Sequence, residues 1–319
     1  MTSASSMLPP DYFNYPRRRL GLDHDWFDAR FMTEVPGVRW PGGARLALWI
    51  TVDLEHFPMD MPATPFVPTG GMLRPYPSYW DYTQRDYGNR VGIFRIMQVL
   101  DRLGLRASVA ANQAVLSRYP ALAEAIVARE WEVVASGVDM GRLHYGGMDP
   151  DEERSLIAQS VMTLRGLTGQ AVTGWHSPAN SCSMNTYDLL PGAGITYVTD
   201  WINDELPFPM RTRSGKLMSL PRNMEMSDKA LLVEHVNTRA SFAEQILAAT
   251  RFLLDEATAD QGRILSLSLS PWVVGQPWCI ATLETLLGAI AEQPDIWCAT
   301  GAQVLDAWEL GRNMSVPTG

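Results

Sequence analysis

The sequence predicts an α/β fold in which helices cover a parallel sheet. Strand-like and helix-like segments alternate at least six times between about residue 45 and residue 310. Such alternation is typical of a parallel sheet, either open and doubly wound or closed into a barrel. Polar side chains collect where the strand-like segments end, and in a closed barrel those ends form one rim, where active sites lie. No glycine-rich phosphate loop follows the first strand, which weakens the nucleotide-binding version of the open sheet.

The expected elements follow one another along the chain. Short apolar runs predict strands at residues 45–52, 107–111, 132–136, 172–175, 196–200, 264–269 and 296–299. Apolar residues at helical spacing predict helices at 91–103, 120–130, 149–167, 241–258, 280–292 and 303–310, with a further short helix between the strands at 172–175 and 196–200. Residues 57–87 are rich in Pro, Gly and Tyr and are expected to form a long loop, which in a compact domain is usually functional.

The composition excludes several classes of protein. The chain has 319 residues, of which 46% are hydrophobic and 19% charged, as in ordinary globular domains. Its net charge of -9 argues against a nucleic-acid or anionic-membrane partner, because phosphate binding needs a clustered positive field. No apolar run is long enough for a membrane helix, three cysteines are too few for a disulfide scaffold, and the first ten residues lack the pattern of a secretory signal. We therefore expect a cytoplasmic protein with a small-molecule substrate.

The N-terminal segment differs from the rest of the chain. Residues 1–43 are rich in Pro, Arg, Gly and aromatics and show no clean periodicity, so they are expected to form an arm in front of one barrel domain at 44–319. The aromatic stretch at 11–16 could wrap a second subunit, which favours a homo-oligomer.

Acidic residues close the first predicted strand. Asp53 and Glu55 point to the same side of a strand, since side chains alternate along it, and His56 follows directly. Two nearby carboxylates push their pKa values apart, which suits general-base catalysis. The alternative is a solvated strand end in which a carboxylate pairs with an arginine.

A second polar stretch, at 137–144, follows another predicted strand and contains Asp139 and His144. A zinc site needs about three protein ligands, and no two histidines of the chain are spaced as a pair. We therefore expect no metal. The alternative that stays open is a divalent ion held by Asp53, Glu55, His56 and Asp139.

Other candidates lie in loops after later strands. His176 precedes a turn and could act as an acid or a base near neutral pH, or could simply bond to the loop backbone. Trp272 could stack on a planar substrate, and loop packing is its alternative role. The remaining candidates for substrate binding are Asp200, Trp201, Asn203 and Ser270.

Five segments carry a family resemblance. They lie at residues 40–55, 87–92, 167–178, 197–207 and 269–277. In this order they resemble motifs of the polysaccharide deacetylase superfamily, and more narrowly of its metal-independent allantoinase and cyclic-imide hydrolase branch. The resemblance covers residues 36–310 approximately. It implies a distorted (β/α)7 barrel of the polysaccharide deacetylase type and hydrolysis of a non-peptide C–N bond.

The chain departs from the motifs of that family at several positions. Gly137 stands where the first motif histidine is expected, His176 replaces an arginine, Ser270 replaces the late histidine, and Gln276 replaces a second arginine. The loss of both histidines argues against a zinc- or cobalt-dependent deacetylase. Asp53 remains at the position of the deacetylases' general base, and Glu55 lies near their carboxylate ligand position.

These features together predict a metal-independent hydrolase of an amide, a cyclic amide or imide, or a ureide. Asp53 or Glu55 would act as the general base, and His56 or His176 would protonate the leaving nitrogen. Backbone amides or Asn203 would hold the oxyanion, and Trp201 and Trp272 would wall the pocket. Asp139, His144, Asp200 and Ser270 complete the expected substrate-binding set.

Two alternatives remain open. One is a lyase or isomerase on the same barrel, because acids and histidines without a metal also suit proton abstraction next to a carbonyl. The other is a catalytically inactive, ligand-binding relative of an enzyme.

Overall fold

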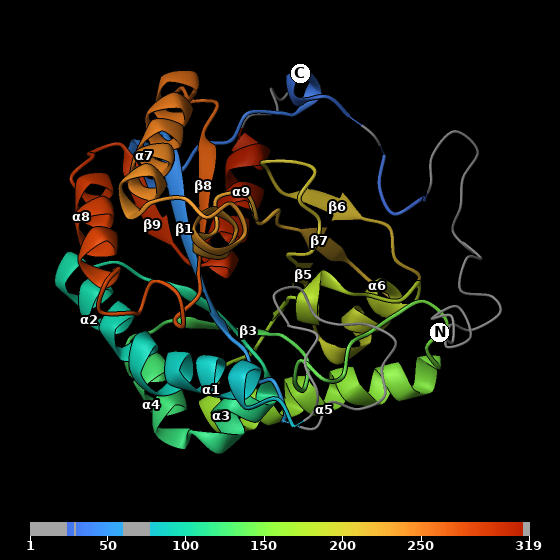
Figure 1. Cartoon of the computed structure of the whole chain (residues 1–319). Coiled ribbons are helices and arrows are strands. Elements are labelled where there is room, and N and C mark those ends of the chain that lie inside the picture. The colour runs from blue at the N-terminus through green and yellow to red at the C-terminus, as the bar shows by residue number, and fades with distance from the viewer. Residues whose placement is uncertain (1–23, 29, 60–76, 315–319) are drawn as a thin grey trace, which may run out of the picture.

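The computed structural model describes residues 24–28, 30–59 and 77–314, and Figure 1 shows the whole chain. Residues 1–23 of the expected arm, with the stretch at 11–16, and residues 60–76 of the expected loop lie outside this part of the chain. Among the described residues, no helix is both long and apolar enough to cross a bilayer.

A curled sheet forms the centre of the molecule, and most of the helices pack around its outside (Figure 1). Its strands run in the order β6-β7-β5-β4-β3-β2-β1-β8, and β9 pairs with β1. The strands are β1 (Leu46–Leu54), β2 (Ser108–Ala111), β3 (Glu132–Ala135), β4 (Gly174–Trp175), β5 (Tyr197–Val198), β6 (Phe208–Met210), β7 (Leu217–Ser219), β8 (Arg263–Leu269) and β9 (Ile296–Ala299). Apart from the antiparallel pair β6–β7, the paired strands are parallel, which confirms the predicted barrel-type α/β fold.

The helices alternate with the strands as expected. They are α1 (Tyr79–Tyr87), α2 (Ile93–Leu103), α3 (Gln113–Arg118), α4 (Pro120–Ala128), α5 (Pro150–Thr168), α6 (Thr186–Leu189), α7 (Arg239–Glu256), α8 (Ile280–Ala291) and α9 (Gly301–Met314). Two π-helical turns span Gly88–Gly92 and Lys229–Glu234, and short 3-10 turns span Met32–Glu34, Pro41–Gly43, Pro178–Asn180 and Leu190–Ala193. Gly104, in the left-handed conformation, ends α2, and the Asp149 side chain caps the first turn of α5.

The structure adds elements that the sequence did not predict. Helix α1 lies inside the expected loop at 57–87, where Ser78 caps a largely polar helix without a clear apolar period. Helix α3 and the pair β6–β7 are also new, because elements of three to six residues show too few periods to be recognised.

The alternation of side chains along β1 decides which residues point into the barrel. Leu48, Ile50 and Val52 face outward and belong to the main apolar core under the helices. Ala47 and Trp49 face inward and pack with α9 in a second core. Since side chains alternate, the residues that continue the inward series are Thr51, Asp53 and Glu55.

Strand β8 repeats this arrangement, with leucines outward and Ser266 and Ser268 inward. Among the described strands, β6 and β8 are the ends of the sheet and are not paired with each other, so the sheet has an open seam between them. Hydrogen bonds to the serines of β8 bridge it: Arg222 Nε donates to Ser268 Oγ (2.7 Å), and the Asn223 backbone N–H donates to Ser266 Oγ (3.3 Å). The interior of the barrel is therefore polar beside this seam.

Candidate active site

A cavity of about 260 Å³ lies at the carboxyl ends of the parallel strands. Its wall includes Asp53 from β1, Ser136 after β3, His176 after β4 and Ser270 after β8. Glu55 and Lys229 also line it. Barrel enzymes carry their catalytic groups at this end of the strands, which makes this cavity the candidate active site.

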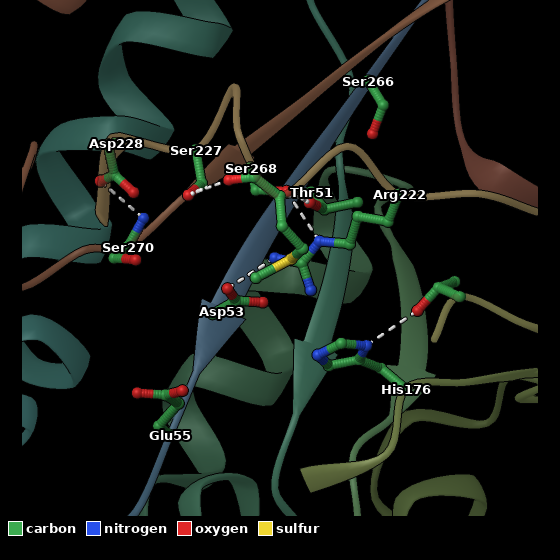
Figure 2. A network of polar contacts seen from close by, with 12 residues as sticks. Thr51, Asp53, Glu55, His176, Arg222, Ser227, Asp228, Ser266, Ser268 and Ser270 are labelled. Atoms are coloured by element: carbon green, nitrogen blue, oxygen red, sulfur yellow. Dashed lines mark hydrogen bonds and ion pairs between the residues drawn. The ribbon is translucent and has the colours of Figure 1, made fainter. Parts of the chain in front are cut away.

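Asp53 is held by a buried arginine that the sequence did not reveal. Arg222 Nη2 lies 2.6 Å from Asp53 Oδ2, and its Nε is fixed by Ser268, which also accepts a hydrogen bond from Thr51 (3.0 Å; Figure 2). The Arg222 side chain is 1% exposed. Asp53 Oδ1 and Arg222 Nη1 are both buried and have no hydrogen-bond partner among the described residues. One carboxylate oxygen is thus anchored, while the other is free to accept.

Glu55 has an arginine partner as well. Its Oε2 lies 3.5 Å from Arg85 Nε, and the Arg85 guanidinium lies 4.5 Å from the ring centre of Phe57 and 4.1 Å from that of Trp272. The two carboxylates share one cavity, as the strand alternation predicted, but each also forms the arginine pair weighed as the alternative. Trp272 is buried against Arg85 and is not among the residues that line this cavity, so the structure does not support its predicted role as a pocket wall.

His176 is buried beside the Asp53–Arg222 pair. Its Nδ1 lies 2.9 Å from Thr199 Oγ1 and 3.5 Å from Asp200 Oδ1, and Asp200 in turn accepts hydrogen bonds from Ser177. Burial, and then the charge of Arg222, lower the pKa of His176 to about 3, although Asp53 opposes this shift. The ring is therefore neutral near pH 7. A neutral ring does not support the predicted role of His176 as donor of a proton to the leaving nitrogen.

Asp228 is a second site residue that the sequence did not reveal. Its Oδ2 accepts the Ser270 backbone N–H at 2.8 Å (Figure 2), while its Oδ1 is buried without a partner among the described residues. Burial raises the pKa of Asp228 to about 7; hydrogen bonds from Ser270 oppose the shift, and the charge of Asp53 adds to it. Arg222 and Asp228 both follow the three-residue strand β7, which gives no recognisable strand pattern.

His56 and Asp139 lie together but outside this cavity wall. Residue 56 has the opposite parity to Asp53 and Glu55, so its ring packs against Tyr82 at 6.0 Å between ring centres. Burial lowers the pKa of His56, while the charge of Asp139 opposes this effect. Asp139 Oδ1 accepts the Gly141 amide at 2.9 Å. The predicted role of His56 as proton donor is therefore not supported by its position.

The remaining predicted residues serve other contacts. His144 Nδ1 pairs with the buried Glu153 at 2.9 Å, and Asp200 lies behind His176. Trp201 packs against Phe27 and Tyr187. Asn203 lines three other cavities and is absent from the wall shared by Asp53 and Ser270, so the structure does not bring it to the expected oxyanion.

The residues around Asp53 do not fit a divalent metal ion. No three His, Cys, Asp or Glu side chains within the described ranges are grouped as a metal site would require. The nearest charged neighbour of Asp53 is instead the Arg222 guanidinium, whose fixed positive charge would repel such an ion. The ion considered for Asp53, Glu55, His56 and Asp139 is likewise unsupported, because the last two residues lie outside the wall.

Comparisons with known proteins agree with the fold. No family model matches the chain. A curated Schizosaccharomyces pombe protein, provisionally named a polysaccharide deacetylase, is 22% identical over 300 residues, which is 84% of this chain and 92% of that protein. A peptidoglycan deacetylase-like protein of Gibberella zeae is 26% identical over 124 residues, which is 37% of this chain and 35% of that protein.

Two solved structures align with nearly the whole chain. PuuE allantoinase has a TM-score of 0.78 at 21% identity, covering 89% of this chain and 97% of the other. A provisionally named polysaccharide deacetylase from Pseudomonas aeruginosa PAO1 has a TM-score of 0.76 at 22% identity, covering 89% and 98%. Curated and structural neighbours together show that this chain has the polysaccharide deacetylase-like fold that its motifs predicted.

Proposed function

We propose that the protein hydrolyses a C–N bond in a small amide, cyclic amide or imide, or ureide, without a metal ion and with Asp53 as the general base. The names of its neighbours, an allantoinase and two polysaccharide deacetylases, support hydrolysis at such a bond. The cavity volume of about 260 Å³ suits a small molecule.

The geometry of Asp53 carries this proposal. Arg222 holds Oδ2 at 2.6 Å, which fixes the carboxylate, while Oδ1 has no partner among the described residues and can accept a proton from water. Water placed between Oδ1 and the substrate carbonyl loses that proton to Asp53 as its oxygen attacks the carbon. Lys229 lines the same cavity and supplies a positive charge for the developing oxyanion.

Neutral His176 has a different role from the one expected. A ring that donates from Nδ1 to Thr199 or Asp200 leaves Nε2 as an acceptor. In Figure 2 this side of the ring faces Asp53 and Arg222. His176 therefore orients water or a substrate N–H through a hydrogen bond.

The test is the turnover of lactams, cyclic imides and cyclic ureides by the Asp53→Asn variant. Loss of the general base should lower kcat by roughly 10²- to 10⁴-fold while the fold is retained. The control is Asp151→Asn, which changes an exposed acid in α5 and should leave turnover unchanged. Full activity of the Asp53 variant would refute the proposal. Solvent oxygen-18 should enter the product, and product without it would favour the lyase or isomerase alternative.

An inactive binding protein is the second candidate. The observation that favours it is that both cavity carboxylates, Asp53 and Glu55, have arginine partners. Saturable binding of a cyclic amide without turnover across the whole panel would support this candidate over hydrolysis.

A further inference from the structure

The proposed hydrolysis still needs a proton for the leaving nitrogen. His176 is neutral, and His56 lies outside the cavity wall, so neither histidine expected in this role supplies the proton. The cavity wall contains one hydroxyl that is attached to a buried carboxyl group: Ser270, whose backbone N–H donates to Asp228 Oδ2 at 2.8 Å. The Ser270 side chain is also among the groups that lower the pKa of Asp228 and so oppose the effect of its burial.

The surroundings of Asp228 favour its neutral form. The side chain is fully buried, and Oδ1 has no partner among the described residues. The titratable groups that face it are Asp53 from β1, which is negative, and the Cys279 thiol at the start of α8. Burial raises the pKa of Cys279 to about 11, so that thiol carries no charge near pH 7. The neighbouring Lys229 donates its backbone N–H to Asp228.

We propose that Asp228 is a buried proton source and that Ser270 passes its proton from the cavity wall to the leaving nitrogen. This inference rests on the proposed hydrolysis and identifies the general acid that the reaction needs. In this proposal Ser270 is the catalytic residue, because it lines the cavity, and Asp228, which does not line it, acts through Ser270. A serine hydroxyl alone is a weak acid. It can donate a proton here because Asp228, behind it, replaces the proton that Ser270 gives to the leaving nitrogen.

The proton transfers balance. Water gives one proton to Asp53 as its oxygen bonds to the carbonyl carbon, forming a tetrahedral intermediate. As the C–N bond breaks, the Ser270 hydroxyl proton moves to nitrogen, and the Asp228 proton moves to the Ser270 oxygen. The first products are a carboxylic or carbamic acid and an amine or amide, with Asp53 protonated and Asp228 ionised. The acid then loses its proton to solvent. Exchange with solvent then returns the proton from Asp53 to Asp228.

The kinetic test compares two rings that differ in the leaving atom. Dihydrocarbostyril is a lactam whose nitrogen must be protonated as it leaves, whereas dihydrocoumarin is the matching lactone and leaves as a phenolate. In Ser270→Ala, the ratio of lactam to lactone kcat/KM should fall by roughly 10²-fold. Ser270→Thr keeps a hydroxyl and should restore the ratio. The double variant Asp228→Asn/Ser270→Ala should be no worse than Ser270→Ala alone, because the two residues act as one unit.

The pH dependence gives a second readout. Lactam turnover in the wild type should fall as pH rises through about 7, where Asp228 loses its proton, and this limb should vanish in Ser270→Ala. Carbon-13 NMR of the Asp228 carboxyl should show the same midpoint without any substrate. A ratio unaffected by Ser270→Ala, or a carboxyl already ionised at pH 5.5, would overturn the relay. A wild-type protein that opens neither ring would instead contradict the proposed function itself.

Discussion

At this site, the protonation states of single residues depend on burial more than on the neighbouring residues in the sequence. Asp53 and Glu55 were predictable because side-chain alternation directs both inward, Asp53 near the end of β1 and Glu55 directly after it. The same alternation explains why His56, one residue further, points elsewhere. The low pKa of His176 and the raised pKa of Asp228 were not predictable, because both depend on burial by segments distant in sequence.

The pKa shifts of His176 and Asp228 affect the free energy of unfolding in opposite ways as pH changes. The pKa of His176 falls from 6.5 to about 3 on folding, so its contribution to stability is complete above pH 6.5 and is lost as pH falls toward 3. The pKa of Asp228 rises from 3.8 to about 7, so its contribution is complete below pH 3.8 and is lost as pH rises toward 7. Each has a limiting slope of about 1.4 kcal/mol per pH unit.

Replacing Asp228 and replacing His176 should therefore change the pH dependence of the free energy of unfolding in opposite directions. The free energy of unfolding of Asp228→Asn, relative to wild type, should rise with pH between about 4 and 6.5. That of His176→Gln, relative to wild type, should fall over the same window. Urea unfolding at several pH values measures both differences, and two variants whose curves run parallel to wild type would contradict the assigned protonation states.

At the scale of elements, a π-helical turn packs against the loop that begins at Ser270. The turn Gly88–Gly92 packs against the backbone that follows Ser270. A Cβ added at Gly92 would lie 2.0 Å from the Pro271 carbonyl oxygen, which is too close for any side chain. The glycine in this motif is thus required by a close approach of two backbones.

Gly92→Ala should consequently shift the Pro271 loop and lower both stability and lactam turnover. We expect a loss of about 1–3 kcal/mol, as for other overpacked sites. Gly166→Ala in α5 is the matched control, because a Cβ there meets nothing within 4 Å, and it should raise stability by about 0.5–1 kcal/mol. Thermal unfolding of both variants checks this, and equal effects of the two substitutions would contradict the packing argument.

At the scale of the whole molecule, the sequence predicted the strongly periodic parts. The buried runs of β1 and β8 and the long helices α5 and α7 were recognised because many residues repeat the same pattern. The seam between β6 and β8 was not recognised, since it is bridged by side chains such as Arg222 instead of by backbone pairing. The arm at 1–43, a homo-oligomer and a cytoplasmic location stay predictions.

The central claim is that this barrel activates water with Asp53 and no metal ion. The most direct test is the rate of ring opening by wild-type protein before and after complete removal of metals by a chelator, with metal content measured by elemental analysis. An unchanged rate in metal-free protein is the predicted result. A rate that disappears with the metal and returns when zinc or cobalt is added would contradict the claim.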